Sequence, residues 1–426
     1  MRHRVAAVTG ADVIVVGGGP AGASTAFGLA RTGARVMLLE RAHFPRPKPC
    51  AECLSPQASR ILADMGALDA VERAGAVRLA GMIVRAPDGA RIHGRFAAAH
   101  GYRAFNDHGL ALRRELLDPI LVDCARRAGV EVYEGVRVVD LDRDAAGRVT
   151  GVVTLSPDGA RAVRSARVVV GADGLHSVVA QRLGVARRRP WPRRIALTAH
   201  FRGVDGMGAF GEMHVARDGY VGLASVDGGL VNVSAVFPHR AAAAIARDRA
   251  AFLDDWLSRQ PQLAPRFAHA QRADDVRAVG PFASHARRAW APGALLVGDA
   301  ADFFDPFTGE GIYSALRGGE LAAIYARAAL AATSPAEADT ALAAYDRARR
   351  REFGGKWIVE RVIGAVIAWA PLINRVARAC EAHGELADLL VGVAGDFVPP
   401  REVMRPSILF TLFARPLPAA RAAPRA

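Results

Sequence analysis

Residues 12–40 constrain this chain more than any other stretch, because they contain a complete strand–turn–helix–strand pattern. A short apolar run leads into Gly17, Gly19 and Gly22, which have the spacing G-x-G-x-x-G, and a helical run and a second apolar run follow. The first glycine allows a tight turn, the second leaves room for a pyrophosphate, and the third lets the helix lie close to the sheet. The stretch therefore predicts a dinucleotide-binding unit with parallel strands.

The residues that adjoin this turn indicate which dinucleotide is bound. The helix begins at Pro20 and Ala21, so its free N–H groups and its positive end would face the phosphates. Glu40 ends the second strand, where it can accept both hydroxyls of an adenosine ribose and would disfavour a 2′-phosphate. We therefore predict FAD or NAD here and not NADP, and we count the neighbouring Arg41 among the candidate binding residues.

The overall composition allows a large core and argues against a nucleic-acid-binding protein. The chain has 426 residues, which is enough for two or three domains, and its 51% hydrophobic residues allow a large core. The net charge is +14, but the arginines that carry it are scattered and form no nucleic-acid-binding motif, so arginine-rich coding accounts for the excess. A basic face for an anionic membrane surface, or for a phosphorylated substrate, stays open as an alternative.

Location is predicted from segments that the sequence lacks. The first residues contain no apolar run of the kind found in a signal peptide, and no uncharged stretch reaches the roughly 18 residues of a membrane span. The cysteines at positions 50, 53, 124 and 380 are too few and too spread for a disulfide scaffold. We expect a cytoplasmic protein, with peripheral contact to the inner membrane face as an alternative.

A proline-rich loop at residues 44–54 carries Lys48, Cys50 and Cys53. Lys48 is notable because almost all other cations are arginines, and an ammonium does not replace a guanidinium. The cysteine pair has three interpretations: a structural zinc site, which would need further ligands; a thioredoxin-like redox pair, which would have to open a helix; and small thiols that line a cofactor or substrate pocket, which we favour. Cys50 and Lys48 are the candidate catalytic residues.

The middle of the chain changes from alternating strands and helices to an antiparallel sheet. From Arg194 to Val279, strands separated by Asp-Gly turns predict a meander. The elements expected before it are a hairpin over residues 81–97, an amphipathic helix over 110–129, strands over 130–139 and 148–155, and a second strand–turn–helix unit over 164–184.

A second G-x-G-x-x-G occurs in this meander, at Gly206, Gly208 and Gly211. No buried strand precedes these glycines, and a strand follows them where a helix would be needed. We therefore exclude them as a second dinucleotide site.

The last third returns to the first domain and then becomes helical. An apolar strand at residues 294–297 leads into a loop, and the loop opens a long helix that ends near residue 330. Residues 357–371 are expected to form an amphipathic helix that packs in the core, covers a pocket or rests on a membrane. The proline- and arginine-rich tail after Pro399 is expected to be loose.

Three motifs in order resemble FAD-dependent enzymes of the glutathione-reductase fold: the opening fingerprint, GADGLHSVVA at residues 171–180 and GDAADFFDPFTGEGI at residues 298–312. Over residues 12–325 the chain is similar to the group that holds aromatic hydroxylases, flavin halogenases and geranylgeranyl reductases. The resemblance implies an α/β fold with a Rossmann-like FAD-binding domain, an inserted antiparallel-sheet substrate domain and a helical C-terminal region. The implied boundaries are 8–80, 110–190 and 280–330 for the FAD-binding domain, 81–109 and 191–279 for the substrate domain, 331–400 for the helical region and 401–426 for the loose tail.

The resemblance also implies cofactor contacts. Arg114, in the segment RRELLD, would reach the flavin side of FAD, and Asp173 and Gly174 would lie near the pyrophosphate. Gly298 precedes Asp299, which would bind the ribityl chain. A loop along the isoalloxazine would aim N–H groups at the edge where reduced flavin is anionic. The residues of that loop are Pro306, Gly309, Glu310, Gly311 and Ile312.

Two segments indicate which branch of this group the chain resembles most. KPCAECLSP and PFTGEGI are similar to the K-x-C-G-x-G-L-S-P and P-x-T-G-E-G-I segments of geranylgeranyl-reductase-like proteins, although Ala51 and Cys53 replace two glycines. The halogenase segment W-x-W-x-I-P does not occur, and Trp191-Pro192 is the nearest sequence to it, so halogenation is not expected. The leading hypothesis is that FAD, reduced by NAD(P)H or by a small electron carrier, passes a hydride to a C=C bond of a small apolar or prenylated substrate.

Two alternatives keep the cofactor and change the function. An FAD-dependent monooxygenase would hydroxylate or epoxidise an aromatic or polyketide-like substrate through hydroperoxyflavin. An electron-transfer flavoprotein would instead deliver electrons to a protein partner. Oxygen consumption separates the first alternative from a reductase, because a reductase turns over without oxygen.

Overall fold

The apolar run of the opening motif lies in the middle of a mainly parallel sheet. β1 (Ala6–Val16) pairs in parallel with β2 (Val36–Leu39) and β11 (Arg161–Gly171), and β8 (Glu131–Tyr133) and β21 (Ala294–Leu296) extend the sheet on either side. The apolar part of β1 is fully buried, as expected for a strand covered on both faces. The computed structural model describes residues 6–97, 101–156, 158–188, 193–282 and 284–416.

Antiparallel strands complete this sheet. β9 (Arg137–Arg143) pairs with β10 (Val149–Leu155), β10 pairs with β11, and β20 (Trp290–Ala291) pairs with β21. The single strand predicted over residues 130–139 is therefore wrong. Gly135, with φ of 72°, turns the chain, so that β8 stays with the parallel strands while β9 joins β10.

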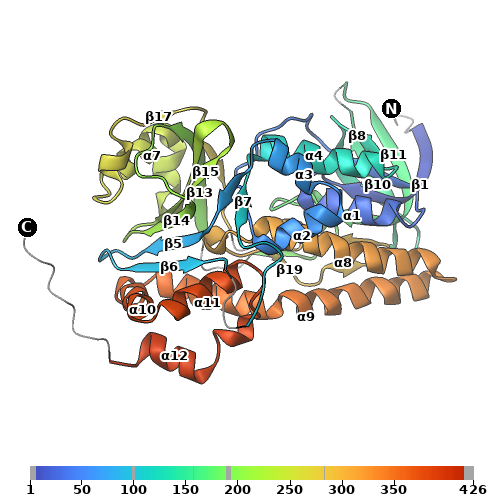
Figure 1. Cartoon of the computed structure of the whole chain (residues 1–426). Coiled ribbons are helices and arrows are strands. Elements are labelled where there is room, and N and C mark those ends of the chain that lie inside the picture. Colours follow the sequence, from blue (N-terminus) through green and yellow to red (C-terminus); the bar gives the residue numbers. More distant parts are fainter. Residues whose placement is uncertain (1–5, 98–100, 157, 189–192, 283, 417–426) are drawn as a thin grey trace, which may run out of the picture.

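The long helices of this domain pack against one another. α1 (Pro20–Ala30) contacts α4 (Arg114–Arg127) and α8 (Gly311–Ala331), and α8 contacts α9 (Pro335–Ile367). Figure 1 shows α8 and α9 lying side by side below the sheet. The predicted end of α8 near residue 330 is confirmed.

The helix predicted over residues 110–129 is shorter than expected. It begins at Arg114, because the preceding residues form β7 (Gly109–Ala111), which pairs with β3 (Cys53–Leu54) and β4 (Val77–Leu79). This small sheet ties the end of the proline-rich loop to the start of α4. The other short elements are α2 (Pro56–Asp64), α3 (Leu68–Arg73), α5 (Val178–Arg182), β12 (Ala186–Arg188), β19 (Ser284–Ala286) and β22 (Asp302–Phe303).

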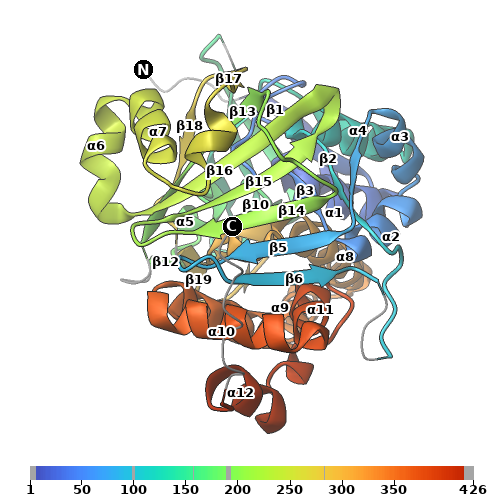
Figure 2. The same ribbon diagram turned by 60° about the vertical axis from the view of Figure 1, so that its left-hand side comes forward.

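A second sheet is mainly antiparallel, as the sequence predicts (Figure 2). Its strands in spatial order are β17 (Gln271–Arg272), β13 (Arg194–Arg202), β16 (Leu230–Pro238), β15 (Tyr220–Val226), β14 (Phe210–Val215), β5 (Gly81–Arg85) and β6 (Arg91–Arg95), with β18 (Arg277–Val279) beside β13. β5 and β6 form the predicted hairpin. The glycines excluded as a second dinucleotide site lie in the turn before β14 and in β14 itself.

The two faces of this sheet have different neighbours. α6 (Ala242–Arg247) precedes α7 (Arg249–Ser258), and Trp256 of α7 is buried against Leu197 and other side chains of one face. Side chains alternate along a strand, so Ala196 and Thr198 of β13 point the other way. That second face lines the cavity described below.

The amphipathic helix predicted over residues 357–371 is wrong as a single element. α9 ends at Ile367, and α10 (Ala370–Ala382) begins after Trp369, with the two helix axes bent by 111°. In the described part of the chain, no single helix has the length and apolar character to cross a membrane, whereas this bent pair meets both criteria together.

α11 (Gly384–Ala394) lies in the region predicted to be helical and packs with α10 against β6. The tail predicted to be loose is partly helical, because it contains α12 (Pro406–Phe413). Leu412 of α12 is buried in the same apolar cluster as α10, which is why the proline- and arginine-rich composition misled the prediction. Residues 417–426, like Trp191 and Pro192, lie outside the described residues.

Candidate active site

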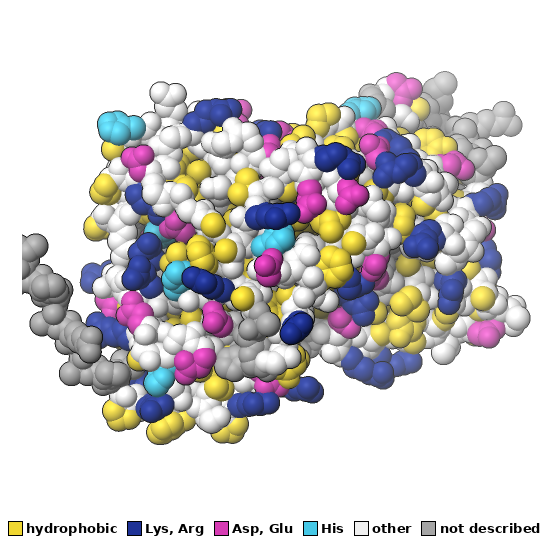
Figure 3. Space-filling model, in the orientation of Figure 1, with side chains coloured by type: hydrophobic (Ala, Val, Ile, Leu, Met, Phe, Trp, Pro, Cys, Tyr) yellow, Lys and Arg dark blue, Asp and Glu magenta, His cyan; other side chains and the backbone are white. Residues whose placement is uncertain are grey.

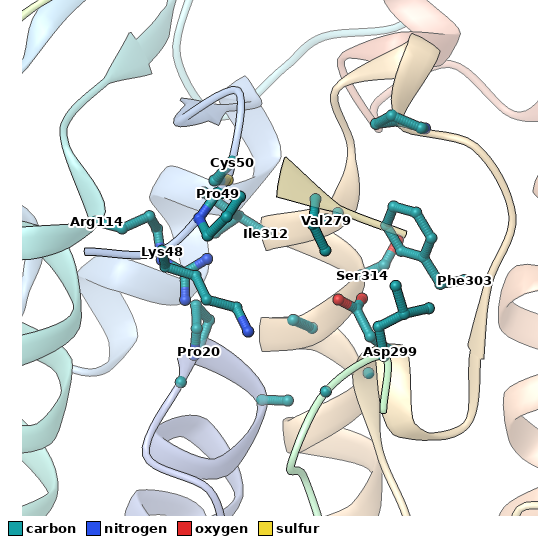
Figure 4. Close-up of a pocket in the computed structure, with 18 of the residues that line it drawn as sticks. Pro20, Lys48, Pro49, Cys50, Arg114, Val279, Asp299, Phe303, Ile312 and Ser314 are labelled. Atoms are coloured by element: carbon teal, nitrogen blue, oxygen red, sulfur yellow. The ribbon is translucent and has the colours of Figure 1, made fainter. Parts of the chain in front are cut away.

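One cavity joins the two sheets. Its volume is about 750 Å³, and its walls come from the glycine turn, the proline-rich loop, the start of α8, one face of the second sheet and the C-terminal half of α9. Figure 4 shows Lys48 and Cys50 on one side of this space and Asp299 and Phe303 on the other. Of the predicted cofactor-binding and catalytic residues, all but Gly22 line it.

Gly22 does not line the cavity, but it allows the close packing of α1 on the glycine turn that forms part of the wall. Gly17 has φ of 103°, and a Cβ there would lie 2.5 Å from the carbonyl oxygen of Ala172. A Cβ on Gly22 would lie 1.8 Å from the carbonyl oxygen of Gly17, so α1 can approach the turn this closely only with glycine. A Cβ on Gly19 would make ordinary contacts, the nearest 3.5 Å from Arg114, because this glycine faces the cavity.

Glu40 is held in place by the chain around it. Its carboxylate accepts hydrogen bonds from the backbone N–H groups of Gly18 (2.9 Å) and Ala42 (3.0 Å) and lies 3.4 Å from the guanidinium of Arg46. Burial raises the pKa of Glu40, but Arg46 and the two N–H groups outweigh it and hold the pKa below its usual value. Glu40 is therefore an ionised acceptor at the cavity, suited to the hydroxyls of a ribose.

Arg46 is a cavity residue that the sequence interpretation missed. Its guanidinium stacks on Phe44, its Nη1 lies 3.1 Å from Asp118, and its buried Nε has no hydrogen-bond partner among the described residues. Asp118 also accepts two hydrogen bonds from Arg114, of 2.6 and 2.8 Å. Two guanidinium groups thus share one carboxylate beside Gly19, and the unused N–H suits an anionic group such as a pyrophosphate. The site therefore fits FAD.

Asp173 has its carboxylate engaged within the chain. It accepts hydrogen bonds from the hydroxyl of Ser177 (2.6 Å) and the backbone N–H of Val178 (2.7 Å), so it stabilises the start of α5. Burial raises the pKa of Asp173. The pyrophosphate contact implied for Asp173 and Gly174 stays a prediction.

Lys48 and Asp299 face each other across the cavity (Figure 4). Burial lowers the pKa of Lys48, Arg114 lowers it further, and Asp299 opposes both. Burial likewise raises the pKa of Asp299, against the effect of Lys48 and Arg114. Within the described chain the two groups form no direct ion pair, so a polar part of a ligand can lie between them.

Cys50 and Cys53 are free thiols. Burial raises the pKa of Cys50 and raises the pKa of Cys53 to about 12, so both are protonated at neutral pH and neither is an activated nucleophile. Cys53 lies in β3 and the pair does not open a helix, which argues against the thioredoxin-like interpretation. Both thiols line the cavity, in agreement with the interpretation that we favoured.

Glu52 is a second residue that the sequence interpretation missed. It has φ of 62°, and its carboxylate accepts hydrogen bonds from the backbone N–H of Arg114 (2.9 Å) and the amide of Asn232 (2.9 Å) and lies 2.8 Å from Nε2 of His200. Asn232 also donates to the carbonyl oxygen of Cys50 (2.9 Å). The proline-rich loop is therefore tied to facing positions of β13 and β16. This pairing across 148 residues leaves no local signal in the sequence.

The loop before α8 rests on a buried charged cluster. Glu310 lies 2.6 Å from Nζ of Lys356, and Lys356 also pairs with Asp396. Burial lowers the pKa of Lys356, but the two carboxylates raise it above its usual value, so the lysine is charged. Lys356 was missed, although the rarity of lysine that drew attention to Lys48 applies to it equally. Both lysines of the chain line the cavity.

The wall opposite the glycine turn is mostly apolar. It carries a polar cluster in which the carboxylate of Asp305 accepts hydrogen bonds from the hydroxyl of Tyr220 (2.5 Å) and from Arg194 (2.5 Å). Glu360 of α9 also lines the cavity. The apolar side chains of this wall are Ala196, Met213, Val236, Val279, Phe282, Phe303 and Phe304.

Known proteins are similar to this chain in sequence and in architecture. A family model described as FAD binding domain matches residues 10–357. Menaquinone reductase of Mycolicibacterium smegmatis is 29% identical over 333 residues, which cover 74% of this chain and 76% of that protein. Digeranylgeranylglycerophospholipid reductase 1 of Methanococcoides burtonii is 28% identical over 353 residues, 81% of each chain. Conditioned medium factor receptor 1 of Dictyostelium discoideum is 29% identical over 337 residues, and this chain spans 62% of its length.

Two solved structures are similar over most of their length. The myxobacterial chondrochloren halogenase CndH, an FAD-dependent halogenase, has a TM-score of 0.76 at 28% identity, covering 83% of this chain and 82% of that one. A geranylgeranyl bacteriochlorophyll reductase-like protein of Thermoplasma acidophilum has a TM-score of 0.71 at 22% identity, covering 96% of each chain. The second similarity, at this identity, concerns the fold alone.

Proposed function

From the premise that this chain belongs to the FAD binding domain family and is an FAD-dependent oxidoreductase, we propose that it reduces a C=C bond of an apolar or prenylated substrate. The observation that carries the proposal is the cavity, which runs without interruption from the glycine turn to the apolar wall of the second sheet. A ligand on that wall would share this space with a cofactor bound at the glycine turn. Similarity to two proteins named as reductases supports the same class of reaction.

The chain's own residues bind, orient and exclude water. FAD, when bound, supplies the two-electron chemistry. Glu40 accepts ribose hydroxyls, Arg46 and the N-terminus of α1 bind the phosphates, and the backbone before α8 is held by Glu310 and Lys356. The apolar wall keeps water from the reacting atoms, and Cys50 contacts the substrate as a neutral thiol. Electrons reach the site from NAD(P)H or a small carrier.

The alternative is a monooxygenase on the same fold. The specific observation in its favour is the 28% identity to a solved FAD-dependent halogenase, which belongs to a different reaction class from the reductases. The FAD-binding residues would be the same in both cases, so the two functions differ in the fate of oxygen and of the substrate.

Anaerobic turnover separates the two functions. Protein loaded with FAD is reduced with NADH or NADPH in the absence of oxygen and is then mixed with a menaquinone or a geranylgeranyl lipid. The masses of the products are measured by mass spectrometry. A product that keeps two more hydrogens after air has reoxidised any quinol supports the reductase, because reduction of a quinone ring also adds two hydrogens but is reversed by oxygen. An oxygen-dependent product with one more oxygen atom overturns it in favour of the monooxygenase, and a folded protein that takes up no FAD overturns both.

Cys50→Ala tests the substrate contact, with Cys380→Ala, at a buried position of α10, as the control. We expect Cys50→Ala to keep its FAD and lose turnover, because the thiol lines the cavity that would hold the substrate. Unchanged turnover in Cys50→Ala, or an equal loss of turnover in Cys380→Ala, would contradict a contact between Cys50 and the substrate.

We also propose that the protein contacts an anionic membrane surface through an apolar edge formed by Trp369 and Phe410. These side chains are 61% and 58% exposed, and exposed arginines flank the second at Arg405 and Arg415. Figure 3 shows hydrophobic side chains and basic side chains together along the lower edge, where Figure 1 places α12. Tryptophan and arginine are favoured at the interface of an anionic bilayer.

Sedimentation with vesicles tests this contact. Binding to vesicles that contain phosphatidylglycerol should fall at least several-fold in the double variant Trp369→Ala, Phe410→Ala. Ile324→Ala is the control, because Ile324 is 52% exposed on α8, away from this edge. Equal sedimentation of the wild type with neutral and anionic vesicles, or of both variants, would contradict the proposal.

A further inference from the structure

Reduction of a C=C bond needs a proton as well as a hydride, and the cavity contains several groups that could donate one. Most of them are already engaged. The hydroxyl of Tyr220 donates to Asp305, and Glu52 is bound by Arg114 and by side chains of the second sheet. Burial raises the pKa of the Cys50 thiol, which makes it a weak acid, and Lys48 faces Asp299 beside Pro20, at the glycine turn (Figure 4).

Glu360 differs from these groups. It lies on α9 one turn after Lys356, it is partly buried, and its side chain lines the cavity with Trp357. Within the described residues its carboxyl group forms no hydrogen bond and no ion pair. A carboxyl group that lines a cavity without a hydrogen bond or an ion pair is desolvated, and desolvation favours its protonated form.

We propose that Glu360 donates the proton that completes the reduction of the C=C bond. The inference rests on the proposed function, which supplies the two electrons and the hydride. The O–H bond of the carboxyl group breaks, and a C–H bond forms on the alkene carbon that does not receive the hydride. Glu360 is left as a carboxylate and takes a proton from water before the next turnover.

The charges around Glu360 favour this role. Burial raises its pKa to about 7; Lys356 lowers it, and Asp302, Asp305 and Asp396 raise it. An acid whose pKa lies near the working pH is both protonated often enough and acidic enough to transfer a proton. The cations beside these acids are already paired: Arg349 with Asp302, Arg194 with Asp305, and Lys356 with Asp396 and Glu310.

The variant Glu360→Gln tests the inference, because glutamine keeps the shape of the side chain and removes its acidic proton. The rate of substrate reduction should fall at least about 100-fold, the usual scale of general acid catalysis. In the wild type this rate should decrease as the pH rises through about 7, because the donor must be protonated, and that decrease should vanish in the variant. Reduction of bound FAD by NAD(P)H should be unchanged. Glu352→Gln, at an exposed position of the same helix, is the control.

A second measurement needs neither FAD nor substrate. Infrared difference spectra of the cofactor-free protein should show the carbonyl band of a protonated carboxyl group that disappears between about pH 6 and 8. The band should be lost in Glu360→Gln and kept in Glu352→Gln. Absence of a titrating band in the wild type, or a variant with unchanged rate and pH profile, would overturn the role of Glu360 alone. A wild type that yields no reduced product overturns the proposed function and the inference with it.

Discussion

Lys356 shows how a single side chain supports the candidate site. Its ammonium is buried between Glu310 and Asp396, and it lies 4.8 Å from the ring centroid of Tyr313. Lys356→Met would leave two buried carboxylates without their cation, which should destabilise the protein by about 3–5 kcal/mol. Urea unfolding measures the loss. Arg259→Met, which removes an exposed ion pair with Asp255, should change stability by no more than about 1 kcal/mol, and an equal loss in the two variants would contradict a special role for Lys356.

Residues that act through local sequence were predictable, and residues that act through distant pairing were not. The glycine turn and Glu40 are recognisable because their neighbours in the chain form the rest of the unit. Glu52 depends on His200 and Asn232 of the second sheet, and Glu310 depends on Lys356 and Asp396 near the C-terminus. No spacing in the sequence records such contacts. The functional roles assigned to the individual site residues stay predictions.

At the scale of elements, the close packing of α1 on the turn depends on Gly22. Gly22→Ala would place a methyl group on the carbonyl of Gly17, where backbone cannot move aside, and we expect FAD binding to be lost and the protein to be destabilised by about 1–3 kcal/mol or more. Gly354→Ala, in the middle of α9 with nothing near its added Cβ, should instead stabilise by about 0.5–1 kcal/mol. Flavin fluorescence titration and thermal unfolding check both variants, and retained FAD affinity in Gly22→Ala would contradict the assigned packing.

Elements with a strong local period were predicted well, and their ends were set by tertiary contacts. The hairpin of β5 and β6 and the helix α8 are confirmed. The first residues of the helix predicted over 110–129 instead form strand β7, which pairs with β4. The helix predicted over residues 357–371 is interrupted at Trp369. Both errors arose because apolar residues fit a strand, a bend or a helix equally until their partners are known.

At the scale of the whole molecule, the cavity couples the two sheets, because its walls come from both. A ligand that fills it should therefore stabilise the protein as a unit. FAD at 100 times its dissociation constant should add about 2.7 kcal/mol to the free energy of unfolding. Thermal unfolding of cofactor-free and FAD-loaded protein measures this, with AMP as a control that occupies only the adenosine end. A single cooperative transition that moves up with FAD is expected, and a transition in which only part of the molecule responds would contradict the coupling.

The two lysines have a practical consequence. Since both line the cavity, the outer surface offers an acylating reagent no lysine side chain with which to react. Labelling at Lys48 should therefore be slow, and a bound cofactor should shield it further. Peptide mapping after such labelling would report occupancy of the interior without any assay of turnover, and coupling through lysine side chains would be a poor way to immobilise this protein.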